Sequence, residues 1–500
     1  MTPDHERATP RIEEINCDLC IIGAGVAGLN ALFSASRYLS QNQKVVLVDR
    51  NPGAGGMWLS VYDYVRLHQP HPMFTAGNIA WTAGRDPSYL AARPEVVAHL
   101  KHCVETSRQR LAVDERYGYE YRSHDESGAG PDDVLVECAP LSANAPPLRI
   151  KTKKLVKAFG HDVRTKDALA LSSNDVRSVS PDKHDLLGDE MRSSNAPVYI
   201  VGGGKTAMDT AHALITRFPN KQVSLLIGKG TMFACRDKLY PAGLRRWWGG
   251  TTPLSAFLDL AQRFDGRNEG EVLDRLRSNY TVSLVADSRR FMLGLLSEQE
   301  NTVIARAARE LIKDYLADVV DRDGRPTLLL KSGASRAIEP GSWIVNCTGY
   351  AFQNATPYEP YVSKSGKVVS VQPCSAIHVL STIASYFLVH LAYLNQLKRL
   401  PLYELDFNAL YRANRDVLSA SIPTHALYNA ALVIGAVPKS VLQEFGTDLE
   451  LWYPAPRRLL DGVRFMQFQK RKPEHLKRSL DAIRERFDVR CGPLQHVGQA

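Results

Sequence analysis

Three glycines near the start of this 500-residue chain have the spacing Gly23-x-Gly25-x-x-Gly28. They separate an apolar run that begins at Cys17 from a stretch with helical character. This spacing suits phosphate binding, because the first glycine allows a tight turn, the second lets a pyrophosphate approach, and the third lets helix and strand pack closely. Asp49 follows Gly23 by 26 residues (49 − 23) and ends a second apolar run, where a carboxylate can bind a ribose hydroxyl. We therefore predict a strand–turn–helix–strand unit that binds a dinucleotide.

The same pattern recurs in the middle of the chain. Residues 198–201 are apolar and lead into Gly202-x-Gly204-x-x-Ala207, which opens a second helical stretch. Lys205 and Thr206 begin that helix, where backbone N–H groups and the helix dipole favour a phosphate. An internal duplication of this kind predicts two dinucleotides bound by one chain.

The two units differ where the ribose is expected. Counting 26 residues from Gly202 leads to Gly228 instead of an acid, and three basic residues follow, Lys229, Arg236 and Lys238. An acid suits a free 2′-hydroxyl, whereas a neutral residue with nearby cations suits a 2′-phosphate. We therefore assign FAD to the first unit and NADPH to the second, with Lys229 or Arg236 on the 2′-phosphate.

Composition excludes several other classes of protein. The net charge is +9 and the pI about 9.0, but basic and acidic residues are interleaved, so no nucleic-acid site is expected. Two short basic clusters, 470–472 and 477–478, are interpreted as a solvated helical face. Eight scattered cysteines and no leader favour a reducing cytoplasm. Cys17 and Cys20 lie inside the first strand, where a redox pair would be inaccessible.

These elements predict an α/β protein with two Rossmann-like domains, the NADPH domain inserted in the FAD domain, and a helical C-terminal cap. The expected parts are a loose arm (1–14), the FAD domain (15–165 and 336–400), the NADPH domain (195–335) and the cap (401–500). Residues 94–112 are expected to form an amphipathic helix, and 269–321 to be mostly helical.

One long uncharged stretch raises the question of a membrane span. Residues 371–397 contain no charged side chain, which is long enough to cross a bilayer. Polar residues are nevertheless dense within it. We expect a buried helix of about four turns, capped by Thr382, and no transmembrane span.

Four further motifs resemble the FAD- and NADPH-dependent class B monooxygenases, over roughly residues 15–395. Gly55-Gly56-Met57-Trp58 is similar to the family's GGxW loop beside the flavin. Residues 64–70, YVRLHQP, are similar to its LxLHxP segment. Cys347-Thr348-Gly349-Tyr350 resembles its ATGY motif, and residues 158–160 resemble an earlier ATG.

The sequence also departs from that family's pattern. The FxGxxxH segment that precedes the second fingerprint is reduced here to Ser178-x-Ser180-x-x-x-His184. His68 stands where many members have an asparagine close to the flavin. The choice between amine, sulfur and carbonyl substrates therefore stays open.

The resemblance implies that NADPH reduces FAD and that a C4a-(hydro)peroxyflavin then passes one oxygen atom from O2 to a small organic substrate. It places His68 and Gln69 at the reactive edge of the flavin as catalytic candidates. The implied cofactor contacts come from both units and from the resembling motifs: Gly23, Gly25, Gly28, Asp49, Arg50, Gly56, Met57, Trp58, His68, Gly202, Gly204, Lys205, Thr206, Lys229, Arg236, Thr348 and Gly349.

Two other functions remain open at this point. An NADPH-dependent flavoprotein reductase would bind the same cofactors and pass electrons onward without oxygenation. A non-catalytic flavin-binding sensor is also conceivable, although the glycines of both nucleotide sites are intact. No metal site is expected, and a homo-oligomer is possible.

Overall fold

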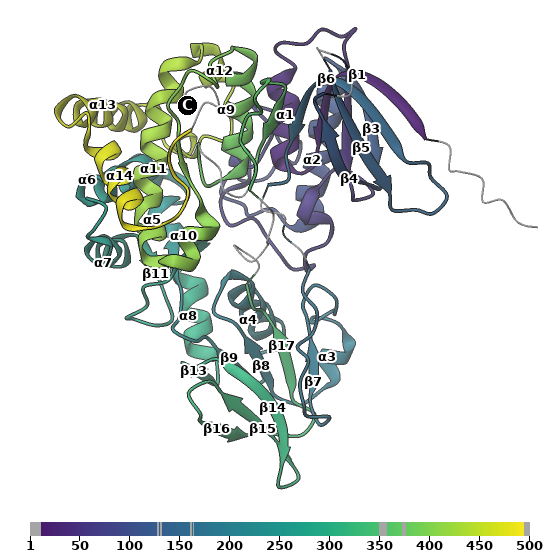
Figure 1. Cartoon of the computed structure of the whole chain (residues 1–500). Coiled ribbons are helices and arrows are strands. Elements are labelled where there is room, and N and C mark those ends of the chain that lie inside the picture. Colours follow the sequence, from purple (N-terminus) through teal and green to yellow (C-terminus); the bar gives the residue numbers. More distant parts are fainter. Residues whose placement is uncertain are drawn as a thin grey trace, which may run out of the picture.

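A computed structural model describes residues 12–127, 130, 133–160, 163, 165–349, 358–372 and 377–494. The chain forms two sheet-containing units and a helical part, which lies beside the first unit and above the second in Figure 1. An arm was expected over residues 1–14, of which residues 1–11 lie outside the described residues. Its last two residues, 13 and 14, belong to strand β1, which begins at Glu13.

The first unit is built on a seven-stranded sheet with the order β3-β2-β1-β6-β5-β4 and β18 paired with β6. β1 is parallel to both β2 and β6, so the carboxyl ends of these strands meet at one edge. Helix α1 packs between this sheet and α9 and is buried from Ala27 to Ala35. The elements of this unit are β1 (Glu13–Ile22), α1 (Val26–Ala35), β2 (Lys44–Asp49), η1 (Gly56–Leu59), η2 (His71–Met73), α2 (Arg93–Arg108), β3 (Ala112–Tyr117), β4 (Tyr119–Asp125), β5 (Val134–Pro140), β6 (Leu148–Lys157), β18 (Val368–Ser370) and α9 (Ser381–Tyr393).

The second unit is built on a five-stranded parallel sheet with the order β13-β9-β8-β17-β7. A three-stranded antiparallel sheet, β14-β15-β16, packs on one face of it, and α4 and α8 lie on the other. The elements are β7 (Arg177–Val179), α3 (Asp189–Ser193), β8 (Val198–Val201), α4 (Lys205–Arg217), β9 (Val223–Leu226), α8 (Glu298–Ala307), β13 (Glu310–Ile312), β14 (Leu316–Arg322), β15 (Arg325–Leu330), β16 (Ser335–Ala337) and β17 (Trp343–Asn346).

The helical part draws on two separate stretches of sequence. Helices α6 and α7, from the middle of the chain, share an apolar core with α10, α11 and α14 from its end. A small sheet of β10, β11 and β12 joins this part to the second unit. The elements are β10 (Met232–Cys235), α5 (Arg236–Leu239), η3 (Gly243–Trp247), α6 (Pro253–Arg263), α7 (Glu269–Tyr280), β11 (Thr281–Val282), β12 (Phe291–Leu296), β19 (Tyr403–Leu405), α10 (Phe407–Ala413), α11 (Arg415–Ala436), α12 (Lys439–Gln443), η4 (Leu449–Trp452), α13 (Ala455–Arg471), α14 (His475–Arg486) and β20 (Cys491–Pro493).

Two domain borders and the helical content of one stretch differ from what the sequence predicted. β17 pairs with β8 and β7, so residues 343–346 belong to the second sheet and not to the segment 336–400 assigned to the first. Residues 253–280 were expected in the 195–335 domain but belong to the helical part, because their apolar side chains pack in its core. Of the stretch 269–321, only α7 and α8 are helical, and the remainder supplies strands.

Two helices bear on the membrane question. α9 covers the central part of the uncharged stretch and is mostly buried, and its N-cap is Leu380 instead of Thr382. Among the described residues, α11 alone is long and apolar enough to cross a membrane, and 72% of its apolar window is buried inside the protein. A core helix passes the same test of length and composition.

Candidate functional site: two dinucleotide-binding turns and the loop between them

The first glycine-rich turn is held tightly between strands β1, β2 and β6. Gly23 has φ +108°, and a Cβ there would lie 2.5 Å from the carbonyl oxygen of Ala158. A Cβ on Gly28 would lie 1.7 Å from the carbonyl oxygen of Gly23. Both glycines are therefore required by close packing, as the spacing predicted.

The second glycine of this turn meets the GGMW loop. A Cβ on Gly56 would lie 2.7 Å from the Cα of Gly25, and the N–H of Gly55 donates to the carbonyl of Ala24 at 3.0 Å. Gly25 caps α1 without a side-chain hydrogen bond, and the first turn of the helix holds no acidic residue. The earliest N–H with an intrahelical partner is that of Leu29, so the N–H groups before it suit a phosphate. The cradle fits the pyrophosphate of FAD.

Asp49 closes the turn from the end of β2. One carboxylate oxygen accepts the N–H of Ala24 at 2.6 Å, and the other accepts the backbone and side-chain N–H groups of Asn51 at 2.7 and 2.9 Å. A carboxylate has about four lone-pair sites, so capacity for a ribose hydroxyl remains. Arg50, the next residue, is exposed.

The remaining residues of the GGMW loop differ in environment. Met57 is 42% exposed. Trp58 packs edge-on against Phe74 at 5.7 Å, and its carbonyl accepts a hydrogen bond from Arg93. Trp58 therefore has a packing role here, and its expected contact with the flavin stays a prediction.

The second glycine-rich turn follows the same plan with more room. Gly202 has φ +138°, and a Cβ there would lie 2.3 Å from the carbonyl oxygen of Cys347, whereas a Cβ on Gly204 would meet nothing within 4 Å. α4 also begins without a side-chain cap or an acid in its first turn. Thr206 lies in the first turn of α4, and its contact with the pyrophosphate stays a prediction. Lys205 is not a free cation, because it forms an ion pair with Asp209 one turn later.

The Cys347-Thr348-Gly349 motif lies beside this second turn. The N–H of Cys347 donates to the carbonyl of Val201, which places the end of β17 next to Gly202. The hydroxyl of Thr348 donates to the Asn346 side chain at 2.7 Å, and a Cβ on Gly349 would meet nothing within 4 Å. Tyr350 lies outside the described residues.

Residues 61–74, which we call the crossing loop, reach from the first unit onto the second. The hydroxyl of Tyr62 donates to the Asp209 carboxylate at 2.9 Å, and the hydroxyls of Tyr64 and Thr210 are 2.7 Å apart. Asp209 and Thr210 both lie on α4. The sequence singled out neither this contact nor Asp209, because nothing in a pattern relates residues 147 positions apart.

His68 sits on the crossing loop among four charged side chains. Burial, followed by the positive charge of Lys205, lowers the pKa of His68 to about 4. The imidazole is therefore neutral at physiological pH, although Asp209 and Glu300 act in the opposite direction. Gln69 is half-buried beside it.

Arg236 forms two contacts within the protein that the sequence did not predict. Its guanidinium pairs with Glu300 and donates to the carbonyl of His68 at 3.3 Å, with 13% of the side chain exposed. Although burial alone raises the pKa of Glu300, the charges of Arg236 and Lys205 outweigh it and bring the value down to about 2. Arg236 thus joins the crossing loop to α8, and its expected contact with the 2′-phosphate stays a prediction.

Other basic residues surround the end of β9. A Cβ on Gly228 would lie 2.3 Å from the Tyr315 ring, which explains why no acid stands there. Lys229 follows and is exposed, and its N–H donates to the Tyr315 hydroxyl at 3.3 Å. Arg290 lies over the same ring at 5.6 Å. Lys229 and Arg290 therefore flank the predicted 2′-phosphate position. Sequence reasoning missed Arg290 because it is 62 residues further along (290 − 228).

Cys17, Cys20 and His184 lie away from both glycine-rich turns in packed surroundings, and the burial of the two cysteines was expected. Cys17 and Cys20 lie in β1, and burial raises the pKa of both thiols, that of Cys17 to about 11. His184 packs against Trp343 at 5.4 Å, with its ring nitrogen 3.6 Å from Glu190. In the described residues, no group of three or more potential ligands could hold a metal ion.

Comparisons with known proteins agree with this architecture. Residues 17–239 match the family model described as pyridine nucleotide-disulphide oxidoreductase. Uncharacterized proteins of Mycobacterium tuberculosis and Mycobacterium bovis are 26% identical over 217 residues, covering 39% of this chain and 35% of each relative. The match thus spans about a third of the length of these curated relatives.

Solved structures with similar folds include both oxygenases and a reductase. An ornithine N-hydroxylase from Kutzneria sp. 744 is 13% identical with a TM-score of 0.48, covering 77% of this chain and 99% of its own. A flavin-containing monooxygenase from Stenotrophomonas maltophilia is 14% identical (TM-score 0.43; 76% and 98%). A bacillithiol disulfide reductase from Staphylococcus aureus is 11% identical (0.43; 78% and 99%). The matched residues 17–239, which hold both glycine-rich turns, are similar to the pyridine nucleotide-disulphide oxidoreductase family.

Proposed function

We propose that the protein is a cytoplasmic, NADPH-dependent FAD monooxygenase that acts on a small organic substrate. The observation that carries this proposal is the crossing loop, which leaves the flavin-side turn and hydrogen-bonds to the helix of the nicotinamide-side turn. One segment thus borders both predicted cofactor sites and carries His68 between them.

The residues of each unit have separate tasks. Gly25 and Gly56 pack backbone against backbone beside the start of α1, where the FAD pyrophosphate binds, and Asp49 accepts ribose hydroxyls. The start of α4 holds the NADPH pyrophosphate, and Lys229 with Arg290 holds its 2′-phosphate.

His68 supplies a neutral hydrogen-bonding group at the junction. Because its pKa is lowered to about 4, the ring can donate one hydrogen bond and accept another without adding a positive charge. Gln69 adds an amide beside it. Bound FAD would supply the redox chemistry between NADPH, a proton and O2, by which one oxygen atom would go to the substrate and the other to water.

A reductase that never oxygenates is the second candidate, and the family match to disulphide oxidoreductases favours it. Its disulfide-reducing form needs an accessible thiol pair. All seven described cysteines are free thiols, six of them buried and Cys17 half-buried, which argues against that form.

Stopped-flow spectroscopy tests the proposal. The holoenzyme is reduced anaerobically with NADPH and mixed with oxygenated buffer, alone and with an amine, a sulfide and a ketone present. We expect a transient that absorbs at shorter wavelength than oxidised flavin and decays faster with a true substrate. Direct return to oxidised flavin under every condition would establish the reductase. Failure of NADPH to bleach the flavin would overturn both readings. His68→Gln serves as the matched variant, with the transient expected to form but to decay faster.

A further inference from the structure

Most of the exposed large apolar side chains lie in the helical part. Of the thirteen large apolar residues that are exposed in the described chain, eight lie in two short segments. These eight, which we call the apolar face, are Leu244, Trp247, Trp248, Leu451, Leu459, Leu460, Val463 and Met466. Trp248 is 73% exposed and Leu459 70%. Contiguous apolar surface of this kind marks an interaction site.

The two segments are joined by hydrogen bonds. One guanidinium nitrogen of Arg457, in the first turn of α13, donates to the carbonyls of Arg246 and Gly249 at 3.1 and 2.5 Å. The other donates to the carbonyl of Gly250 at 3.0 Å. The tryptophan-bearing loop 243–250 therefore lies against the start of α13, which brings the two segments of the apolar face side by side.

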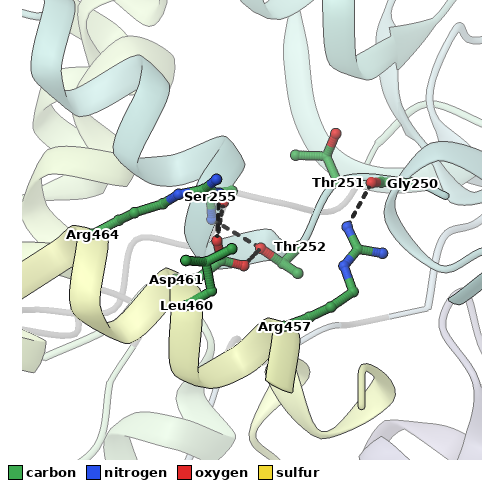
Figure 2. Close-up of a pocket in the computed structure, with 8 residues that line it drawn as sticks. All are labelled: Gly250, Thr251, Thr252, Ser255, Arg457, Leu460, Asp461 and Arg464. Carbon is green, nitrogen blue, oxygen red and sulfur yellow. Dashed lines mark hydrogen bonds and ion pairs between the residues drawn. The ribbon is translucent and has the colours of Figure 1, made fainter. Parts of the chain in front are cut away.

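The side of α13 that faces α6 is held by hydrogen bonds and apolar packing. Figure 2 shows Asp461 binding the hydroxyls of Thr252 and Ser255, at 2.5 and 2.8 Å, at the start of α6. Phe468, which follows Asp461 by seven residues (468 − 461), is buried against α6. A cavity of about 340 Å³ between the two helices is lined by polar side chains and by Leu460 of the apolar face. In Figure 1, α13 forms the outer edge of the helical part.

Most charged residues on α13 and in the loop 243–250 are basic, whereas Asp448 and Glu450 stand beside Leu451. α13 carries five basic side chains and one acid, which gives +4, and that acid is Asp461, only 4% exposed. The loop 243–250 adds Arg245 and Arg246 and contains no acid. Lys470, Arg471 and Lys472, interpreted from sequence as a merely solvated cluster, continue the positive charge at the end of α13.

We propose that the apolar face attaches the protein to the surface of an anionic lipid bilayer without spanning it. Tryptophans together with leucines and flanking arginines are the side chains that settle at the boundary between headgroups and acyl chains. The basic residues match the negative potential of an anionic leaflet. A second copy of the chain fits less well, because two such faces would bring like charges together.

Vesicle co-sedimentation of the full-length holoenzyme tests this proposal. The probes are vesicles of phosphatidylcholine alone and of phosphatidylcholine with about a third phosphatidylglycerol. We expect the protein to pellet with the anionic vesicles, and binding to weaken about fivefold for each basic residue removed and with added salt. Leu459→Glu with Met466→Glu should reduce binding at least tenfold, and Trp247→Ser with Trp248→Ser should do the same.

Leu141→Glu is the matched control, because Leu141 is 57% exposed but lies after β5 in the first unit. It should leave vesicle binding unchanged. Equal loss in this control, or no binding to anionic vesicles by the wild type, would overturn the proposal. A concentration-dependent dimer that the α13 variants convert to monomer, without vesicle binding, would assign the face to a second copy instead. Thermal melts of each variant show that it is folded.

Discussion

The two glycine-rich turns share a plan but differ in how tightly they are enclosed. In the first, a third glycine is required, since a Cβ on Gly28 would overlap the carbonyl of Gly23 at 1.7 Å. In the second, that position is the buried Ala207, and Gly204 opens on free space. Asp49 ties the first turn to β2, whereas Gly228 leaves the second without such a link. A closed site suits a cofactor that stays bound, and an open site suits one exchanged at each turnover.

The largest effect separating the two turns is expected from adding one methyl group to each. Gly28→Ala forces the added carbon onto a backbone oxygen and should cost at least about 3 kcal/mol, the upper range for overpacking, with loss of bound flavin. Gly204→Ala should fold normally and only raise the KM for NADPH, because the added carbon meets no protein atom. Thermal melts, flavin content and KM measure the contrast.

A third glycine, Gly435, provides a control for these two substitutions. Gly435 lies in α11 with nothing within 4 Å of an added Cβ, so Gly435→Ala should be neutral or stabilise by about 0.5 to 1 kcal/mol. Equal destabilisation of the Gly28 and Gly204 variants would remove the distinction between a closed and an open turn.

Asp49→Ala should come next in size. It leaves the buried N–H of Ala24 without its acceptor, at a cost of about 1–3 kcal/mol, and deletes the proposed ribose ligand. We expect purified protein with little flavin, measured by absorbance after desalting. Asn51→Ala is the control, because it removes one donor to Asp49 and leaves the carboxylate in place. Full flavin content in the Asp49 variant would exclude this carboxylate as a ribose ligand.

A smaller, selective effect is expected at the second turn. Lys229→Ala and Arg290→Ala should each raise the KM for NADPH about 10- to 100-fold, the value of a hydrogen bond to a charged group, without changing that for NADH. Arg236→Ala should differ in kind. It leaves Glu300 without its ion-pair partner, so it should lower stability and weaken both nucleotides alike. Steady-state kinetics with NADPH and with NADH measures these effects. If only the Arg236 variant had a selectively raised KM for NADPH, Arg236 would be the ligand of the 2′-phosphate, as one of the two sequence alternatives predicts.

Local motifs account for what could be predicted from the sequence. The strand–turn–helix units around Gly23 and Gly202 form as expected, because their glycine spacing and apolar runs act within about 30 residues. Contacts across long separations could not be predicted in this way. The pairing of Arg236 with Glu300, the position of Arg290 over Tyr315, and the packing of α7 on α11 depend on how distant segments fold together. For the same reason, the sequence misplaced β17, whose four residues read equally well as a strand of either sheet.

The smallest predicted effect concerns His68, which lies where the two units meet. Its pKa in the folded protein, about 4, is below the usual 6.5, so between these values the unfolded chain binds more protons than the folded one. Its contribution to stability is therefore complete above pH 6.5 and is lost as the pH falls towards 4. His68→Gln should flatten the dependence of the melting temperature on pH between 6.5 and 5, a window above the range in which Glu300 titrates. An unchanged slope in the His68 variant would mean that water reaches this ring, and that the crossing loop does not seal the junction between the closed and the open turn.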